Sequence, residues 1–252
     1  MKKLIYMSVL LSSLALAKDY ALIVGMSDYK NIIGLSSVAN DIGVYKKILK
    51  DRGIITKNIK ILKDKEATKS AIEGYLQKTL DEMKKSRSKN NRFFMFFAGH
   101  GISIKYLKDN SSIVKGGFNK FLTNSGAILP YDYNPKAVAN TVIIGKRDLR
   151  PILIKIDKYI HQSLIVFDAC YSGNSIRGKR FTTPFIYSNS KDYPYKNIVY
   201  IASSTPRNRA KSGVLSRVLS SCMTKNRDFK ELKVCMNGEL KNIGQRVTMV
   251  LK

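Results

Sequence analysis

Residues 93–98 read Phe-Phe-Met-Phe-Phe-Ala, an unbroken run of apolar side chains. A strand with one face in water alternates apolar and polar residues, so an unbroken run indicates a strand that is buried on both faces. Further stretches at residues 20–26, 58–62, 164–167 and 198–202 predict four more strands. Such strands need apolar cover on both sides of their sheet.

Stretches with the apolar spacing of amphipathic helices separate these strands. They cover residues 38–49, 68–83 and 149–160, and a fourth follows the last strand at 214–223. Strands that alternate with helices of this length predict a mostly parallel sheet with helices on both faces, which is the α/β fold class. Ligands of such sheets bind outside the carboxyl ends of the strands, so functional residues are expected at that edge.

The first seventeen residues have the layout of a secretory signal peptide. Residues 2–3 are lysines, residues 4–16 carry no charge, and residues 15–17 read Ala-Leu-Ala. The uncharged part is shorter than the roughly 20 residues that span a bilayer, and the alternatives are an uncleaved anchor or a buried helix. We expect cleavage after Ala17 and one domain over 18–252. The mature protein would be exported, periplasmic or secreted, and would meet the membrane only through the signal peptide.

The chain is strongly basic, with 45 Lys plus Arg against 18 Asp plus Glu. A net charge of +27 attracts polyanions such as nucleic acid or anionic membranes. The lysines are spread along the whole chain, however, and the densest stretch, at 84–92, lacks the interleaved aromatic residues of a single-strand binding groove. We therefore expect no specific nucleic-acid partner. A basic polyanion-binding module remains an alternative function.

Three cysteines stand at positions 170, 222 and 235. An odd number in an exported protein suggests one disulfide and one free thiol, and Cys222 could pair with Cys235, which would leave Cys170 free. Two histidines, no Cys-x-x-Cys motif and no calcium-loop pattern argue against a metal site. We expect no cofactor, and nothing in the sequence indicates activation by calcium.

Two of the predicted strands run into chemically distinctive residues. Residues 93–98 lead into Gly99-His100-Gly101, and residues 164–167 lead into a segment that contains Asp168 and Cys170. A nearby histidine stabilises a thiolate and later protonates a leaving amine. Taken alone, Cys170 is explained as a small buried side chain, and His100 is explained as a structural histidine. Together, at the ends of two parallel strands and beside glycines, they favour catalysis.

The segments FMFFAGHG and DACYSG resemble the caspase-like peptidases, in particular the metacaspase and bacterial caspase-homologue branch. YALIVGMSDY, ANDIGVYKKIL and AILPYDYNP are similar to further blocks of that family, in the family's order, so the resemblance covers residues 19–205 and is weak over 206–252. It implies a three-layer αβα fold and peptide-bond hydrolysis. His100 would be the base and acid, Cys170 the nucleophile, and the backbone amides of Gly101 and Cys170 the oxyanion hole.

The chain departs from true caspases in two respects. Asp168 stands where their Gln-Ala-Cys-x-Gly signature has Gln, and His100 lies 70 rather than about 50 residues before Cys170. Both differences point to the metacaspase-like branch. Asp168 precedes the nucleophile by two residues on a strand and so shares its face, and Asp41 falls where metacaspase-like enzymes supply a second acidic residue. We expect a pocket for Arg or Lys, although Asp41 could only favour a helix start and Asp168 could only cap a loop.

The sequence thus predicts a cysteine endopeptidase with a polypeptide substrate. A caspase-fold binding protein without activity is the other alternative, which the presence of both catalytic residues disfavours. We also expect self-cleavage after a basic residue within residues 171–195. The sequence leaves the oligomeric state open.

Overall fold

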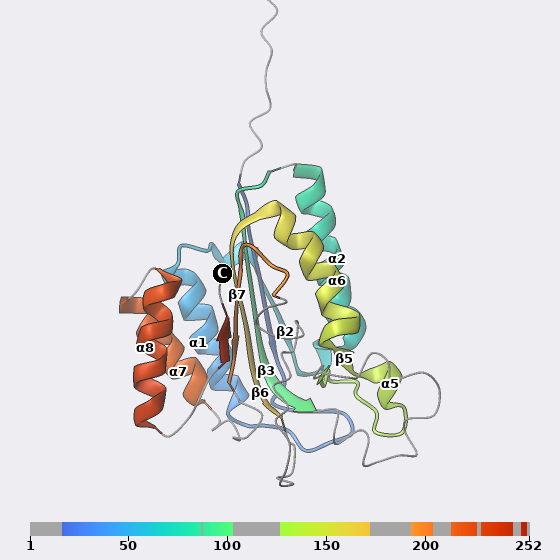
Figure 1. The fold of residues 1–252 in the computed structure, drawn as a ribbon. Helices are drawn as coiled ribbons and strands as arrows, with labels where there is room; N and C mark the ends of the chain where they lie inside the picture. Colours follow the sequence, from blue (N-terminus) through green and yellow to red (C-terminus); the bar gives the residue numbers. More distant parts are fainter. Residues whose placement is uncertain are drawn as a thin grey trace, which may run out of the picture.

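A computed structural model describes residues 17–86, 88–102, 127–171, 193–203, 213–225, 228–243 and 248–250. Within these ranges one sheet has the strand order β2-β1-β3-β6-β7-β8, and β4 and β5 extend it beside β3 (Figure 1). The strands are β1 Asp19–Gly25, β2 Ile59–Lys63, β3 Asn91–Ile102, β4 Ala127–Ile128, β5 Ile143–Ile144, β6 Ile160–Tyr171, β7 Ile198–Ala202 and β8 Thr248–Val250. The neighbours from β2 to β7 pair in parallel, and β8 pairs antiparallel with β7.

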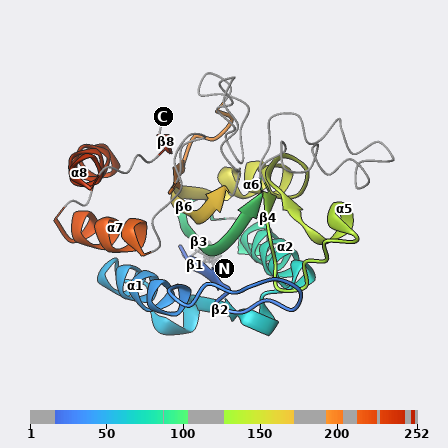
Figure 2. The same cartoon turned by 90° about the horizontal axis from the view of Figure 1, so that it is seen from below.

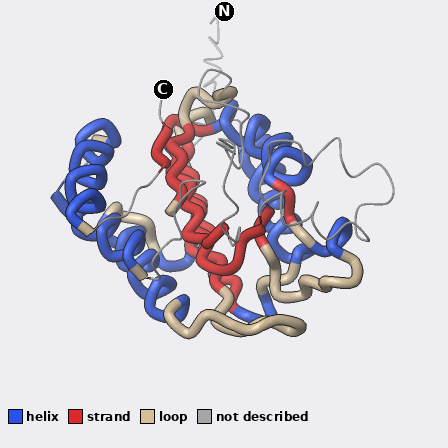
Figure 3. The backbone as a smooth tube through the Cα atoms, turned by 60° about the horizontal axis from the view of Figure 1, so that its bottom comes forward, coloured by secondary structure: helices blue, strands red, loops and turns tan. Residues whose placement is uncertain are grey.

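Helices cover both faces of the sheet, so the fold has the expected three layers (Figures 2 and 3). One face carries α1 Val38–Asp51, α7 Val214–Lys225 and α8 Phe229–Asn242. The other face carries α2 Lys69–Ser86 and α6 Arg150–Ile156, and the short α5 Val138–Thr141 lies beyond them. The predicted α/β architecture is therefore confirmed.

The aromatic run in β3 explains the two-sided burial. Phe93, Met95 and Phe97 pack into the core that α2 and α6 cover. Phe94 and Phe96 point the other way, into the core that α1, α7 and α8 cover. An unbroken apolar run is what a central strand between two cores requires.

The central strands are longer than the sequence indicated. β3 continues to Ile102 and β6 to Tyr171, so His100 and Cys170 belong to the last residues of the strands and do not follow them. The extension has a physical cause, because Gly101 and Ile102 pair with β4 on one side while β6 continues the ladder on the other.

The predicted end of the helix at 149–160 is wrong. α6 stops at Ile156, and a 3-10 turn over Asp157–Tyr159 leads into β6, which already contains Ile160. The buried side chain of Asp157 accepts the backbone amides of Lys196 and Asn197 just before β7, which holds this turn against the sheet. The sequence pattern did not predict α5, α8, β4, β5 or β8.

No helix within the described ranges is long and apolar enough to cross a membrane. The expected leader covers residues 1–17, of which residues 1–16 lie outside the described residues. Lys18, the expected first residue of the mature chain, contacts the domain: its backbone amide donates to Asn91 Oδ1 at 2.9 Å, and its Nζ lies 2.6 Å from Glu82 Oε2.

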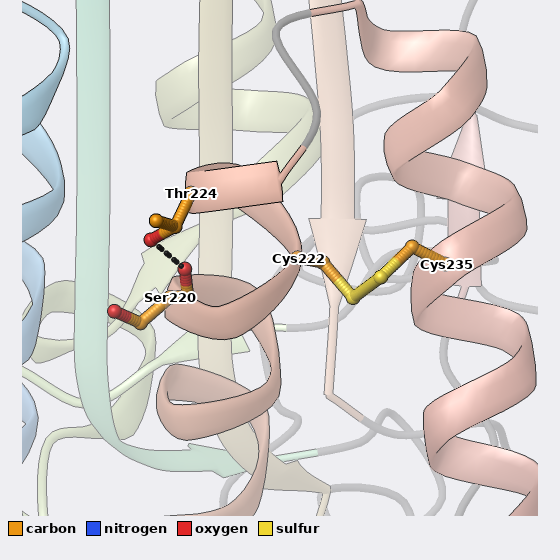
Figure 4. The surroundings of a disulfide bond; sticks show 4 residues. All are labelled: Ser220, Cys222, Thr224 and Cys235. Atoms are coloured by element: carbon orange, nitrogen blue, oxygen red, sulfur yellow. Dashed lines mark hydrogen bonds between the residues drawn. A yellow bond between two sulfur atoms is a disulfide. The ribbon is translucent and has the colours of Figure 1, made fainter.

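A disulfide joins α7 to α8 through Cys222 and Cys235 (Figure 4). The bond closes a short loop, since the two residues are 13 apart in the sequence. Cys222 is fully buried, whereas Cys235 is only partly buried. The structure thereby joins the two cysteines that the sequence left as a candidate pair.

Replacing Cys235 by serine should lower the melting temperature. Closing a loop of this size stabilises a fold by about 3 kcal/mol in the chain-entropy model. In a domain of this size 1 kcal/mol corresponds to about 2–4 °C, so a loss of roughly 6–12 °C is expected by differential scanning calorimetry. Reductant should lower the melting temperature of the unaltered protein similarly and that of the variant hardly at all. Equal melting temperatures would contradict a disulfide in the folded protein.

Candidate active site

The backbones of His100 and Cys170 lie directly opposite each other. β3 and β6 pair in parallel with the register Ala98↔Asp168, His100↔Cys170 and Gly101↔Tyr171. These are the carboxyl ends of the two central strands, where the arrows of β3 and β6 end at the lower edge in Figure 1. The expected meeting of the two residues at one sheet edge is present in the backbone, while the side chain of Cys170 lies outside what the structure describes.

Gly101 follows His100 at the end of β3 and is buried. It pairs with Ile128 of β4 on one side and with Tyr171 of β6 on the other. The backbone amide of Leu129 donates to the carbonyl of His100 at 3.0 Å, which fixes the strand end further. The glycine expected in the oxyanion hole therefore belongs to a rigid part of the sheet.

The loop between β1 and α1 holds His100 at two points. The phenol oxygen of Tyr29 accepts the backbone N–H of His100 at 2.7 Å, and the two rings pack with centroids 5.1 Å apart. The imidazole Nε2 lies 2.9 Å from the carbonyl oxygen of Ile33. Since a carbonyl oxygen only accepts, this contact assigns the proton to Nε2 and leaves Nδ1 as the basic nitrogen.

Gly99 leaves room for this arrangement. A Cβ at position 99 would lie 2.7 Å from the phenol oxygen of Tyr29 and 2.8 Å from Met26 Cε. Burial raises the pKa of Tyr29, so its hydroxyl remains protonated. Sequence analysis missed both loop residues. Tyr29 ends the segment YALIVGMSDY, whose similarity to the family gave it no role in the site, and Ile33 acts through its backbone carbonyl, which its side-chain identity does not reveal.

Asp168 lies two residues before Cys170 in β6. The hydroxyl of Tyr45 on α1 donates to Asp168 Oδ2 at 3.1 Å, and this ring stacks on Phe96 with centroids 4.7 Å apart. Burial and, next, the nearby charge of Asp41 raise the pKa of Asp168 to about 7, while hydrogen bonds from Ser203 and Tyr45 partly offset this rise.

Asp41 lies in the first turn of α1 and is only 3% exposed. Ser216, in the first turn of α7, donates to Asp41 Oδ1 at 2.5 Å. Burial raises the pKa of Asp41, and the Ser216 hydrogen bond opposes that rise. The structure thus brings the two carboxylates expected in a basic pocket within electrostatic reach of each other.

A cavity of about 610 Å³ opens beside Asp41, between α1 and α7. The residues that line it include Asn40, Asp41, Ser216, Ser220 and the exposed Arg217. A second hollow, of about 510 Å³, is lined by Asp28, Lys63, Asp64, Lys65, Glu66 and Tyr131. Across the described part of the chain, no group of three or more His, Cys, Asp or Glu side chains is arranged to hold a metal ion.

Comparison with known proteins supports this reading of the fold. The family model described as caspase domain matches residues 18–249. No curated protein matches the chain significantly. The crystal structure of protein GSU0716 from Geobacter sulfurreducens is similar, with a TM-score of 0.58 and 14% identity over 93% of this chain and 94% of that chain. At this identity the likeness concerns the fold alone.

Proposed function

The chain belongs to the caspase family of cysteine peptidases, and from this premise we propose that it is an endopeptidase that cuts after Arg or Lys with Cys170 and His100. The register pair His100↔Cys170 at the carboxyl edge of the sheet carries the proposal. It is the juxtaposition that a thiol and its base need, on rigid neighbouring strands.

The contacts of His100 supply the chemistry. With the Nε2 proton directed to the Ile33 carbonyl, Nδ1 takes the proton of the Cys170 thiol. The thiolate attacks the peptide carbonyl carbon, and the resulting oxyanion is bound by the backbone amides of Gly101 and Cys170. His100 then protonates the leaving amine as the C–N bond breaks. Water, deprotonated by the same imidazole, hydrolyses the thioester and restores the thiol.

Specificity follows from the two carboxylates. Asp41 and Asp168 lie on elements that meet at the active edge, and each is held by a hydroxyl group, Ser216 Oγ and Tyr45 Oη respectively. A cationic side chain placed between them would relieve their mutual repulsion and gain charge-assisted hydrogen bonds. An aspartate at the same place would add a third negative charge, so acidic residues before the cleaved bond are rejected.

The test compares peptides that differ only in the residue before the cleaved bond, with Arg, Lys, Ala or Asp there, between pH 6 and 8. Because the pKa of Asp168 is raised to about 7, the pocket loses negative charge as the pH falls through this value. The ratio of kcat/KM for the Arg peptide to that for the Ala peptide should therefore rise with pH, by up to about tenfold over the range.

The ratio isolates the pocket, because both peptides are cleaved by the same Cys170–His100 pair and differ only in the side chain that enters the pocket. A preference for Asp would refute the proposed specificity. An Arg-to-Ala ratio that stays constant or falls with rising pH would show that Asp168 is not the group that receives the cation.

A further inference from the structure

Asp64 has an unusual backbone conformation. Among the described residues it is the one non-glycine with positive φ, at 45°. It follows Lys63, the last residue of β2, and begins the 3-10 turn Asp64–Glu66. Most side chains avoid the left-handed region for steric reasons, although Asp enters it more readily than others. Such a conformation persists where contacts with the surrounding structure stabilise it.

In this conformation the Asp64 carboxylate forms hydrogen bonds with the loop that follows β1. Its Oδ1 accepts two successive backbone amides, from Ser27 at 2.7 Å and from Asp28 at 3.0 Å. Lys63 Nζ lies 3.8 Å from the other oxygen, Oδ2. Asp64 thereby fastens the first residues after β1 to the end of the neighbouring strand β2.

Ser27 is also held by a contact from the other end of the loop. Leu35 donates its amide to the carbonyl of Ser27 at 2.9 Å. The approach requires a glycine before it, since a Cβ at Gly34 would lie 2.0 Å from that carbonyl oxygen. Residues 27–35 therefore form a closed loop whose two ends meet at Ser27, where Asp64 holds it.

This closed loop contains both residues that contact His100. Tyr29 accepts the His100 amide, and the Ile33 carbonyl receives Nε2. Tyr29 stands directly after Asp28, whose amide Asp64 accepts, and Tyr29 donates its own amide to Asp28 Oδ1 at 2.8 Å. A continuous chain of contacts thus joins the Asp64 carboxylate to the imidazole.

We infer that Asp64 is a positioning residue for His100, an inference that rests on the proposed Cys170–His100 chemistry. Without its two hydrogen bonds the start of the loop shifts, and the Tyr29 and Ile33 acceptors move away from the imidazole. A displacement of about 1 Å in a catalytic group costs roughly 100-fold in rate. The carboxylates of the specificity pocket, Asp41 and Asp168, are held by other partners, so KM should hardly change.

Two variants distinguish the effect of the Asp64 carboxylate from the effect of its backbone conformation. Asp64→Asn keeps an acceptor oxygen and tolerates positive φ, whereas Asp64→Gly tolerates positive φ but has no acceptor. We expect kcat of Asp64→Asn within about threefold of the unaltered enzyme and kcat of Asp64→Gly lower by about 10- to 100-fold, with KM within twofold in both. Equal kcat values for the two variants would overturn the inference.

A second readout follows the thiol itself. The rate of Cys170 alkylation by iodoacetamide, measured against pH, should shift to higher pH in Asp64→Gly, because a misplaced imidazole no longer favours the thiolate. Should Asp64→Gly fail to fold by circular dichroism, Tyr29→Phe removes the acceptor of the His100 amide in the same loop. Its kcat should fall about tenfold, and an unchanged kcat would refute the inference.

The two proposals fail differently. A wrong function would appear as the absence of Cys170-dependent turnover in the unaltered protein. A wrong role for Asp64 would appear in an active enzyme as Asp64→Gly and Asp64→Asn variants with the same kcat and the same alkylation profile.

Discussion

Cys170→Ala is expected to abolish peptide hydrolysis, and His100→Ala to do nearly the same. Removing a nucleophile or its base in a coupled pair lowers kcat by at least about 10⁴-fold in comparable enzymes. The double variant should be no worse than the single ones, because both residues act in one step. Initial rates with an Arg fluorogenic peptide give the measurement, and melting curves show that the variants are folded.

The chain offers matched controls for this experiment. Cys235→Ser alters another cysteine, in α8, and assays well below its melting temperature should show near-normal turnover. His161→Ala alters the other histidine, an exposed residue near the start of β6 whose Nδ1 lies 2.8 Å from the carbonyl of Asn90. His161 stands at the strand end opposite Cys170, so its loss should leave kcat unchanged. Turnover that survives Cys170→Ala would exclude the mechanism.

Asp168→Asn and Asp41→Asn should each lower kcat/KM for the Arg peptide by roughly 100-fold and leave the Ala peptide nearly unaffected. Truncating one partner of a buried charge pair costs about 2–5 kcal/mol, which corresponds to this range. Asp51→Asn is the matched control, since Asp51 also lies on α1 but is exposed and pairs with Lys47 at 2.6 Å. An Asp168→Asn enzyme with unchanged preference for Arg would show that the specificity arises elsewhere.

Asp168→Asn should not destabilise the fold at alkaline pH. The pKa of Asp168 is raised above its usual value, so the folded state resists ionisation, and stability contributed by the protonated form is lost as the pH rises through about 7. The neutral amide of the Asp168→Asn variant does not ionise and carries no such cost. We expect the melting temperature of Asp168→Asn at pH 8 to equal or exceed that of the unaltered protein, which separates loss of specificity from unfolding.

Much of the architecture is predictable from the sequence because strands between two cores have a distinctive pattern. The run at 93–98 predicts a central strand, and β3 is the strand between β1 and β6. The same reasoning predicts that His100 and Cys170 lie at one edge of the sheet, and the structure adds that their strands are neighbours with the two backbones in register. β4 and β5 have two residues each and β8 has three, which is too short for a periodic signal.

The missed parts of the site depend on tertiary contacts that no pattern encodes. The sequence predicts Asp41 and Asp168 as pocket residues. Ser216, however, lies 175 residues from Asp41 and contacts it only because α7 packs beside α1. Ile33 contributes a carbonyl, which every residue has. Asp64 acts through a positive φ and two distant amides, and nothing in its neighbours in the sequence announces either.

Covalent trapping of the nucleophile shows whether Cys170 attacks substrates that carry a basic residue before the cleaved bond. The protein would be treated with a peptide that ends in Arg and carries a thiol-reactive ketone, and the modified residue would be located by mass spectrometry after digestion. We expect one adduct, on Cys170, that forms at least about tenfold more slowly in His100→Ala and with the corresponding Asp reagent. A protein that forms no adduct at Cys170, or forms it as fast with the Asp reagent as with the Arg reagent, would contradict a basic-specific cysteine peptidase.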